Sequence, residues 1–105
     1  MIIITLSFLR VRGMAIYPFI LLKHKTARAD KVLINHERIH LRQQLELLFL
    51  PFYLFYFINY LYNLITTFDH QTAYRNIIFE QEAYDHEQDG EYLKKRRLFG
   101  FLDYL

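Results

Sequence analysis

The chain has 105 residues, which allows one domain, and its formal net charge of +2 argues against nucleic acid or a strongly acidic partner. Hydrophobic residues make up 53% and aromatic residues 18% of the sequence, which excludes a mostly disordered chain. No cysteine is present, so disulfides are excluded and any metal site must use histidines and carboxylates.

The N-terminal segment is apolar and is expected to form two short strands, Ile2–Leu9 and Met14–Leu22, joined by a turn at Arg10–Gly13. Pro18 cannot donate a ladder hydrogen bond, so the second strand is expected to be an edge strand or to carry a bulge. A helix over the first of these segments is the alternative, because a short apolar run does not distinguish a strand from a helix. The segment lacks a basic start and a small-residue cleavage site, so no cleaved signal peptide is expected.

A polar connector, Lys23–Lys31, precedes a helix that is expected to run from Lys31 to about Leu50, with Asp30 as its N-cap. The apolar stripe of this helix consists of Ile34, Leu41, Leu45 and Leu48. The helix also contains the sequence HExxH, in which His36 and His40 are one turn apart and share one face.

The run Leu47–Phe68 carries no charged residue and is rich in Phe and Tyr. As a helix it is long enough to cross a hydrocarbon core of about 30 Å. Pro51, Asn59 and Asn63 favour instead the central core helix of a small domain. The length of the run and its lack of charge favour membrane association. In the strongest form of this prediction residues 47–68 cross the membrane, and the alternative is a cytoplasmic protein.

A third helix is expected over Thr72–Arg97, and Gly90 is a possible break in it. It contains the acidic sequence FEQEAYDHE at Phe79–Glu87. The basic cluster Lys94–Arg97 is interpreted as a solvated helix end, with contact to an anionic membrane surface as the alternative. Together the elements predict one α+β, mostly helical domain over residues 1–105, with short N-terminal strands, the HExxH helix, a long apolar helix and a C-terminal glutamate helix.

The HExxH motif predicts a zinc site that hydrolyses a peptide bond. Residues i and i+4 of a helix are neighbours, so His36 and His40 can present two imidazoles to one metal ion. Glu37 lies one position round the helix, where it can reach a water on the metal and act as general base. The metal lowers the pKa of that water and polarises the scissile carbonyl. The alternative is a helix with a solvent-exposed histidine pair.

Catalytic zinc sites usually have three protein ligands and one open position, so a third ligand must come from another part of the chain. The later helix offers Glu80 and Glu82, and the choice between them stays open on the residues alone. A substrate peptide is expected to add its extended backbone to the edge of the strand Met14–Leu22.

The order of segments resembles the gluzincin clan of zinc metallopeptidases, and most closely the membrane-embedded peptidase domain of antibiotic-sensing receptors and their antirepressor relatives. The segments that carry the resemblance are YPFILL at Tyr17–Leu22, NHERIHLRQQ at Asn35–Gln44, the apolar run Leu47–Phe68 and FEQEA at Phe79–Ala83. CAAX-processing membrane metalloproteases likewise carry a glutamate three residues before an alanine on their glutamate helix, as Glu80 stands before Ala83 here. The resemblance implies a zinc peptidase acting on a peptide or protein, with His36, His40 and Glu80 as zinc ligands and Glu82 as the runner-up.

The chain also departs from these families. They place an aspartate four residues after the ligand glutamate, where it supports a ligand histidine; this chain has Tyr84 there and Asp85 next. Tyr84 is interpreted as a packed aromatic, with a hydrogen bond to the developing oxyanion as the alternative. The chain has fewer apolar segments than the receptors and resembles a minimal catalytic core. A non-enzymatic scaffold, stabilised by zinc or associated with a membrane, is therefore the alternative function, as an inactive relative or a latent zymogen.

The remaining histidines are not expected to be ligands. His24 lies in the polar connector and is expected to be exposed, and His70 and His86 lie near helix ends and are expected to face solvent or to cap. Arg75 is expected at the surface, with approach to substrate or to a carboxylate as the alternative.

Overall fold

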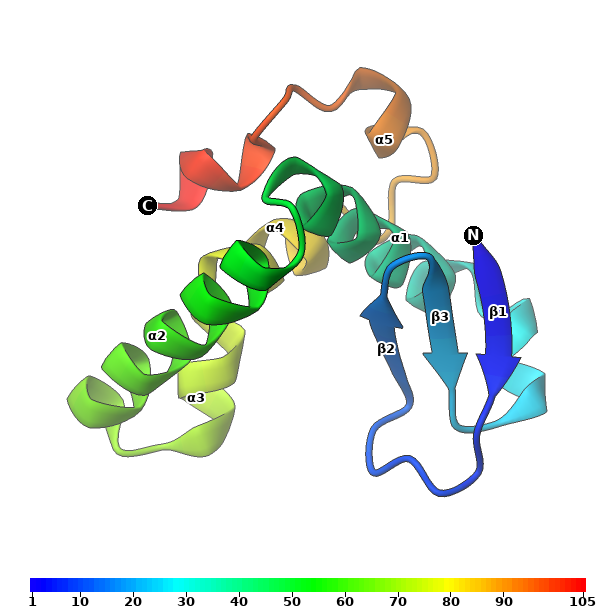
Figure 1. Ribbon diagram of the computed structural model, residues 1–105, viewed down its shortest axis with the longest axis horizontal. Helices are drawn as coiled ribbons and strands as arrows, with labels where there is room; N and C mark the ends of the chain where they lie inside the picture. Colours follow the sequence, from blue (N-terminus) through cyan, green and yellow to red (C-terminus); the bar gives the residue numbers. More distant parts are fainter.

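The computed structural model describes residues 1–105, which form a small sheet and a larger set of helices (Figure 1). The strands are β1 (Ile2–Thr5), β2 (Gly13–Ile16) and β3 (Phe19–Leu22). The helices are α1 (Lys31–Glu46), α2 (Leu50–Thr67), α3 (His70–Arg75), α4 (Ile78–His86) and α5 (Tyr92–Lys95), with 3-10 turns at Lys25–Ala29 and Gly100–Tyr104. The prediction of an α+β, mostly helical fold is confirmed.

The sheet has the order β1-β3-β2, with β3 parallel to β1 and antiparallel to β2. The prediction of one strand over Met14–Leu22 is wrong, because the chain turns at Tyr17 and Pro18 and forms the hairpin β2–β3. Pro18 lies in that turn, where its missing N–H removes no ladder bond. The first strand ends at Thr5 instead of Leu9, and β2 is an edge strand.

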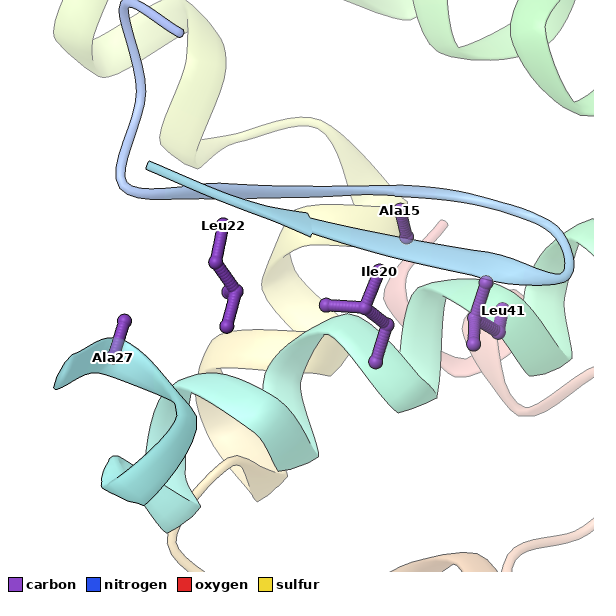
Figure 2. Close-up of a cluster of buried hydrophobic side chains, with 5 residues drawn as sticks. All are labelled: Ala15, Ile20, Leu22, Ala27 and Leu41. Atoms are coloured by element: carbon purple, nitrogen blue, oxygen red, sulfur yellow. The ribbon is translucent and has the colours of Figure 1, made fainter. Parts of the chain in front are cut away.

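One face of the sheet packs on α1. Figure 2 shows the buried cluster between them: Ala15, Ile20 and Leu22 from the sheet, Ala27 from the 3-10 turn and Leu41 from α1. Gln44 of α1 fixes the hairpin to the helix, because its amide donates to the Ala15 carbonyl at 2.7 Å and accepts from the Tyr17 N–H at 2.8 Å. The edge strand β2 is thereby held at a fixed place beside the HExxH helix.

Helix α1 begins where the sequence predicts, since the Asp30 carboxylate accepts a hydrogen bond from the N–H of Leu33 at 3.0 Å. It ends at Glu46, four residues before the predicted end. Leu48 and Phe49 adopt left-handed backbone conformations, with φ of 58° and 65°, and the next helix leaves at 114° to α1. The last two residues of the predicted apolar stripe, Leu45 and Leu48, are exposed.

Helix α2 corresponds to most of the apolar run but is buried at only two positions, Phe52 and Asn63. A second core cluster joins Phe52 to Ile77 and Phe79 at the start of α4 and to Phe101 of the 3-10 turn Gly100–Tyr104. Most of the large apolar side chains of α2 face outward. No single helix combines the length and apolarity needed to cross a membrane; α1 and α2 pass that test only as a pair bent by 114°.

The prediction of one helix over Thr72–Arg97 is wrong, because the chain breaks after Arg75 and after His86 and forms α3, α4 and α5. Side chains from other helices bind the backbone at both breaks. The Asn59 carbonyl oxygen accepts from the N–H of Ile78 at the start of α4, at 2.8 Å. The Asn35 amide of α1 donates to three carbonyls at the end of α4, those of His86, Glu87 and Asp89.

Candidate metal centre

Helices α1 and α4 bring together His36, His40 and Glu80, the three residues that the sequence nominates as metal ligands. The Nε2 atoms of His36 and His40 are 3.2 Å apart, and Glu80 Oε1 lies 3.1 Å from the first and 3.0 Å from the second. All three side chains are buried, so the alternative of a solvent-exposed histidine pair is wrong. Two helices far apart in sequence thus direct three donor atoms at one point.

The donor set fits a small transition-metal ion. Donors bonded tetrahedrally to zinc at 2.0–2.1 Å lie about 3.3 Å from one another. The three separations of 3.0, 3.1 and 3.2 Å in this site are within a few tenths of an ångström of that value. Two imidazoles and one carboxylate are also a ligand combination that zinc accepts.

The orientation of His40 is fixed by Gln43 on the same helix. The Gln43 amide nitrogen donates to the Phe79 carbonyl at 3.1 Å and to Glu82 Oε1 at 2.8 Å. Its oxygen, 2.8 Å from His40 Nδ1, must therefore accept a hydrogen bond from that nitrogen. A proton on Nδ1 leaves the Nε2 lone pair of His40 free to bind a metal.

His36 has a separate partner. Its Nδ1 lies 3.1 Å from Glu87 Oε1, a carboxylate at the C-terminal end of α4. The Glu87 carboxylate is thus placed to accept a hydrogen bond from Nδ1 of His36 and to fix the orientation of that ring. Tyr84 packs edge-on against the His36 ring, with ring centroids 4.5 Å apart, and its hydroxyl lies 3.2 Å from the hydroxyl of Tyr74. The packed-aromatic interpretation of Tyr84 agrees with this contact.

The third donor, Glu80, is held by Tyr56 of α2, whose hydroxyl donates to Glu80 Oε2 at 2.6 Å. Burial raises the pKa of Glu80, but His40, His36 and Tyr56 outweigh it and hold the pKa well below its usual range. Burial alone would lower the pKa of His40, yet the Glu80 carboxylate raises it to about 9. When no metal is bound, His40 and Glu80 therefore form an ion pair, with His40 protonated.

Glu37 is 5% exposed and lines the same cleft as the three donors. Burial raises the pKa of its carboxyl group, and the neighbouring carboxylates of Glu80 and Glu87 act in the same direction, against His40 and His36. A carboxylate with a raised pKa is a stronger base near neutral pH than an ordinary glutamate. Glu37 thus combines a place at the cleft with a pKa above its usual range.

The site opens into a cleft of about 810 Å³. One wall is formed by residues 11–15, which include the outer edge of β2, and the opposite wall by aromatic side chains of α2 and α3. The aromatic wall consists of Phe52, Tyr53, Tyr56 and Tyr74. The donors therefore lie between the edge strand β2, whose Ala15 carbonyl is bound by Gln44, and a largely aromatic surface.

Glu82, the runner-up ligand, lies outside the donor triangle. Its carboxylate contacts the guanidinium of Arg96, and both side chains are 0% exposed. The prediction that Lys94–Arg97 is a solvated helix end is therefore wrong for Arg96, although the rest of the cluster is exposed. The buried pair explains why α4 carries two glutamates at this place: one faces the metal site and the other faces the C-terminal segment.

The other histidines lie outside the donor triangle. His24 is exposed in the connector, as expected. His70 is exposed, lines the cleft and hydrogen-bonds Tyr60 through Nδ1 at 2.8 Å. His86 stacks on the ring of Tyr92 with centroids 3.7 Å apart. The guanidinium carbon of Arg75 lies 3.8 Å from the centroid of the Tyr84 ring. Tyr84 in turn contacts His36, so one aromatic ring separates Arg75 from the candidate metal centre.

Comparisons of the chain with protein-family models, with curated proteins and with solved structures find no match. The resemblance to the gluzincins stays a prediction that rests on the motif residues.

Sequence reasoning did not assign roles to Gln43, Glu87 and Tyr56, which orient the three donors. Two of them carry a signal in their spacing. Gln43 follows His40 by three residues, within one helical turn, and Glu87 follows Glu80 by seven, on the same helix face. Tyr56 has no such signal, because it reaches Glu80 only through the packing of α2 on α4.

Proposed function

We propose that this protein is a zinc-dependent peptidase that cleaves a peptide or protein held in an extended conformation. The observation that carries the proposal is the buried triangle of His36, His40 and Glu80 at a cleft that also contains Glu37. Structural zinc sites normally have four protein ligands, whereas catalytic sites have three and keep one position open. Three converging donors beside a cleft support the catalytic type.

Each group has a role that follows from its position. Bound zinc would supply a Lewis acid that lowers the pKa of a water and polarises a peptide carbonyl. Glu37 takes the proton of the attacking water, aided by its raised pKa, and delivers it to the leaving amine nitrogen. The backbone groups of the β2 edge that Gln44 does not bind pair with the substrate backbone, and Gln44 keeps the strand in place through the Ala15 carbonyl and the Tyr17 N–H.

Metal content and turnover test the proposal together. Elemental mass spectrometry of the purified protein is expected to give about one zinc per chain, lost in His36→Ala and in Glu80→Ala and kept in Glu91→Ala, which changes an exposed glutamate. Glu37→Gln is expected to keep zinc and to lose hydrolysis of a peptide library. Glu91→Gln is the matched control, because Glu91 is an exposed glutamate paired with Lys94. Full activity of Glu37→Gln would contradict the mechanism.

The outer face of α2 supports a proposal on location: this protein associates with a membrane surface through that face. Seven of its large hydrophobic side chains are at least half exposed, as is Phe68 just after the helix: Leu50, Leu54, Phe55, Phe57, Ile58, Tyr62 and Ile65. The helix carries no charge, and exposed basic side chains lie near the C-terminus. Apolar area and anionic headgroups together favour such binding. Co-sedimentation with vesicles, lost in Leu54→Glu and kept in Arg38→Glu, is the expected result.

The same surface favours the alternative function, a zinc-stabilised scaffold at a membrane. The two buried clusters contain only five and four residues, so a bound metal would add much to the stability of this fold. Zinc-loaded protein that binds vesicles but turns over no peptide in the library would favour the scaffold. Turnover that depends on Glu37 would favour the peptidase.

A further inference from the structure

The C-terminal segment, residues 92–105, is joined to the metal centre by a chain of buried polar side chains. The guanidinium of Arg96 contacts Glu82 of α4 through Nε at 2.5 Å and Glu46 of α1 through both terminal nitrogens at 2.7 and 2.9 Å. All three side chains are at most 4% exposed. An arginine that binds two carboxylates in this way fixes their positions, because its donors form a rigid planar fork.

Glu82 transmits this constraint to Gln43. Its Oε2 accepts from Arg96 Nε and from the Tyr92 hydroxyl, and its Oε1 accepts from a terminal nitrogen of Arg96 at 3.1 Å and from the Gln43 amide at 2.8 Å. That contact, together with the hydrogen bond to the Phe79 carbonyl, sets which end of the Gln43 amide faces His40. The sequence of contacts from the C-terminal segment to the metal site is therefore Arg96, Glu82, Gln43 and His40.

We propose that Arg96 is a positioning residue of the metal centre, which acts through Glu82 and Gln43 to keep the His40 ring oriented for metal binding. The inference rests on the proposed metal site, and it makes the C-terminal segment, residues 92–105, part of the structure that this site needs. Without Arg96, the Glu82 carboxylate has lost its main cationic partner and can turn away from the Gln43 amide. The Gln43 amide then keeps only its hydrogen bond to the Phe79 carbonyl, so it is held less firmly as the acceptor of the His40 Nδ1–H.

His36 provides an internal reference, because its Nδ1 is held by Glu87 and not by this chain of contacts. A general loosening of the fold would disturb both histidines. Loss of the contacts from Arg96 would disturb His40 alone. A measurement that reports the two Nδ1–H groups separately can therefore tell positioning from loss of structure.

Cobalt(II) is the probe for this measurement, since the exchangeable Nδ1–H protons of histidines bound to it give separate, strongly shifted NMR signals. In Arg96→Gln, the affinity for Co²⁺ is expected to fall about 10- to 100-fold, as for other partners of metal ligands. The His40 signal is expected to shift or exchange faster, and the His36 signal to stay. Arg97→Gln is the matched control, because Arg97 is exposed and pairs only with Asp103. Equal affinity of the two variants would overturn the inference.

Gln43→Met is the second variant, needed if Arg96→Gln does not fold, since it removes both amide contacts and leaves the Arg96 ion pairs intact. It is expected to weaken Co²⁺ binding to a similar degree and to alter the His40 signal only. If both variants fold, the double variant should be no weaker than Gln43→Met, because the two changes act on one pathway. Additive losses, or wild-type affinity of Gln43→Met, would overturn the inference.

The same measurements separate this inference from the proposed function. If the wild-type protein binds neither Co²⁺ nor Zn²⁺, the proposed function itself is refuted. If the wild-type protein binds metal and Arg96→Gln binds it equally well, only the role of Arg96 is refuted.

Discussion

The hydroxyl of Tyr56 donates a hydrogen bond of 2.6 Å to Oε2 of Glu80. Tyr56 belongs to α2. The only other hydrogen bond between a side chain of α2 and α4 joins the Asn59 amide oxygen to the N–H of Ile78. The apolar helix therefore contributes directly to the candidate metal centre, because Oε1 of the same carboxylate is the donor that faces both histidines.

Tyr56→Phe is expected to lower the affinity for zinc by about tenfold, because Glu80 loses the hydroxyl that fixes its second oxygen. The change removes one oxygen atom and leaves the ring packing on Phe79 in place. Competition with a chelator of known affinity measures the effect. Tyr62→Phe is the control, since Tyr62 lies on the same helix and is 66% exposed. Equal affinities of the two variants would show that the Tyr56 hydroxyl has no part in the site.

Zinc binding at pH 7 is expected to release about one proton per chain. The pKa of His40 is about 9, since the Glu80 carboxylate raises it despite burial, so this imidazole is protonated at pH 7 when no metal is bound. Zinc requires the neutral ring, and the apparent affinity should therefore increase as the pH rises toward 9 and level off above it. Calorimetric titrations in buffers of different ionisation enthalpy measure the proton directly. An observed enthalpy that does not depend on the buffer would contradict the ion pair.

Removal of zinc is expected to lower the melting temperature strongly. A bound ion would join α1 to α4 in a fold with two small core clusters, and at a free concentration 1,000 times Kd a ligand stabilises the native state by about 4 kcal/mol. Thermal unfolding with and without a chelator tests this. His36→Ala should melt like the metal-free wild type and show no response to zinc, whereas His24→Ala should respond like wild type. A wild-type melting temperature that zinc does not change would count against a site in the folded state.

The motif helix could be read from the sequence because its signals are local. Asp30 caps it, and His36 and His40 share a face through helical spacing alone. Glu80 required the resemblance, since no local pattern separates it from Glu82. In the structure the difference comes from the opposite direction of the two side chains, with Glu82 buried against Arg96.

The helix breaks could not be read in the same way, because distant side chains determine them. The ends of α4 bind Asn59 and Asn35, which are 19 and more than 50 residues away in sequence. Arg96 shows the same limit. It lies in a basic run that is typical of a solvated surface, and only the folded chain places Glu46 and Glu82 around it.

The two glycines of the C-terminal region give a matched pair that tests the packing around Arg96. A Cβ atom on Gly100 would lie 2.7 Å from Glu82 Oε2, 3.2 Å from Arg96 Nε and 3.3 Å from the Tyr92 hydroxyl, whereas a Cβ on Gly90 meets nothing within 4 Å. The carboxylate cannot move aside easily, since Arg96 and Tyr92 both bind it. Gly100→Ala is therefore expected to destabilise the fold by about 1–3 kcal/mol, as overpacking of a filled site does.

Gly90→Ala is expected to leave stability nearly unchanged, because the added methyl group enters open space. Urea unfolding of both variants and of wild type measures the difference, and the zinc affinity of Gly100→Ala should fall as well, since the methyl group displaces the carboxylate that holds Gln43. If Gly100→Ala unfolds at the same urea concentration as Gly90→Ala, the C-terminal segment does not pack on Glu82 as described. If it is destabilised but binds zinc like wild type, the segment packs there without influencing His40, and the role of Arg96 at the metal centre is refuted while the fold stands.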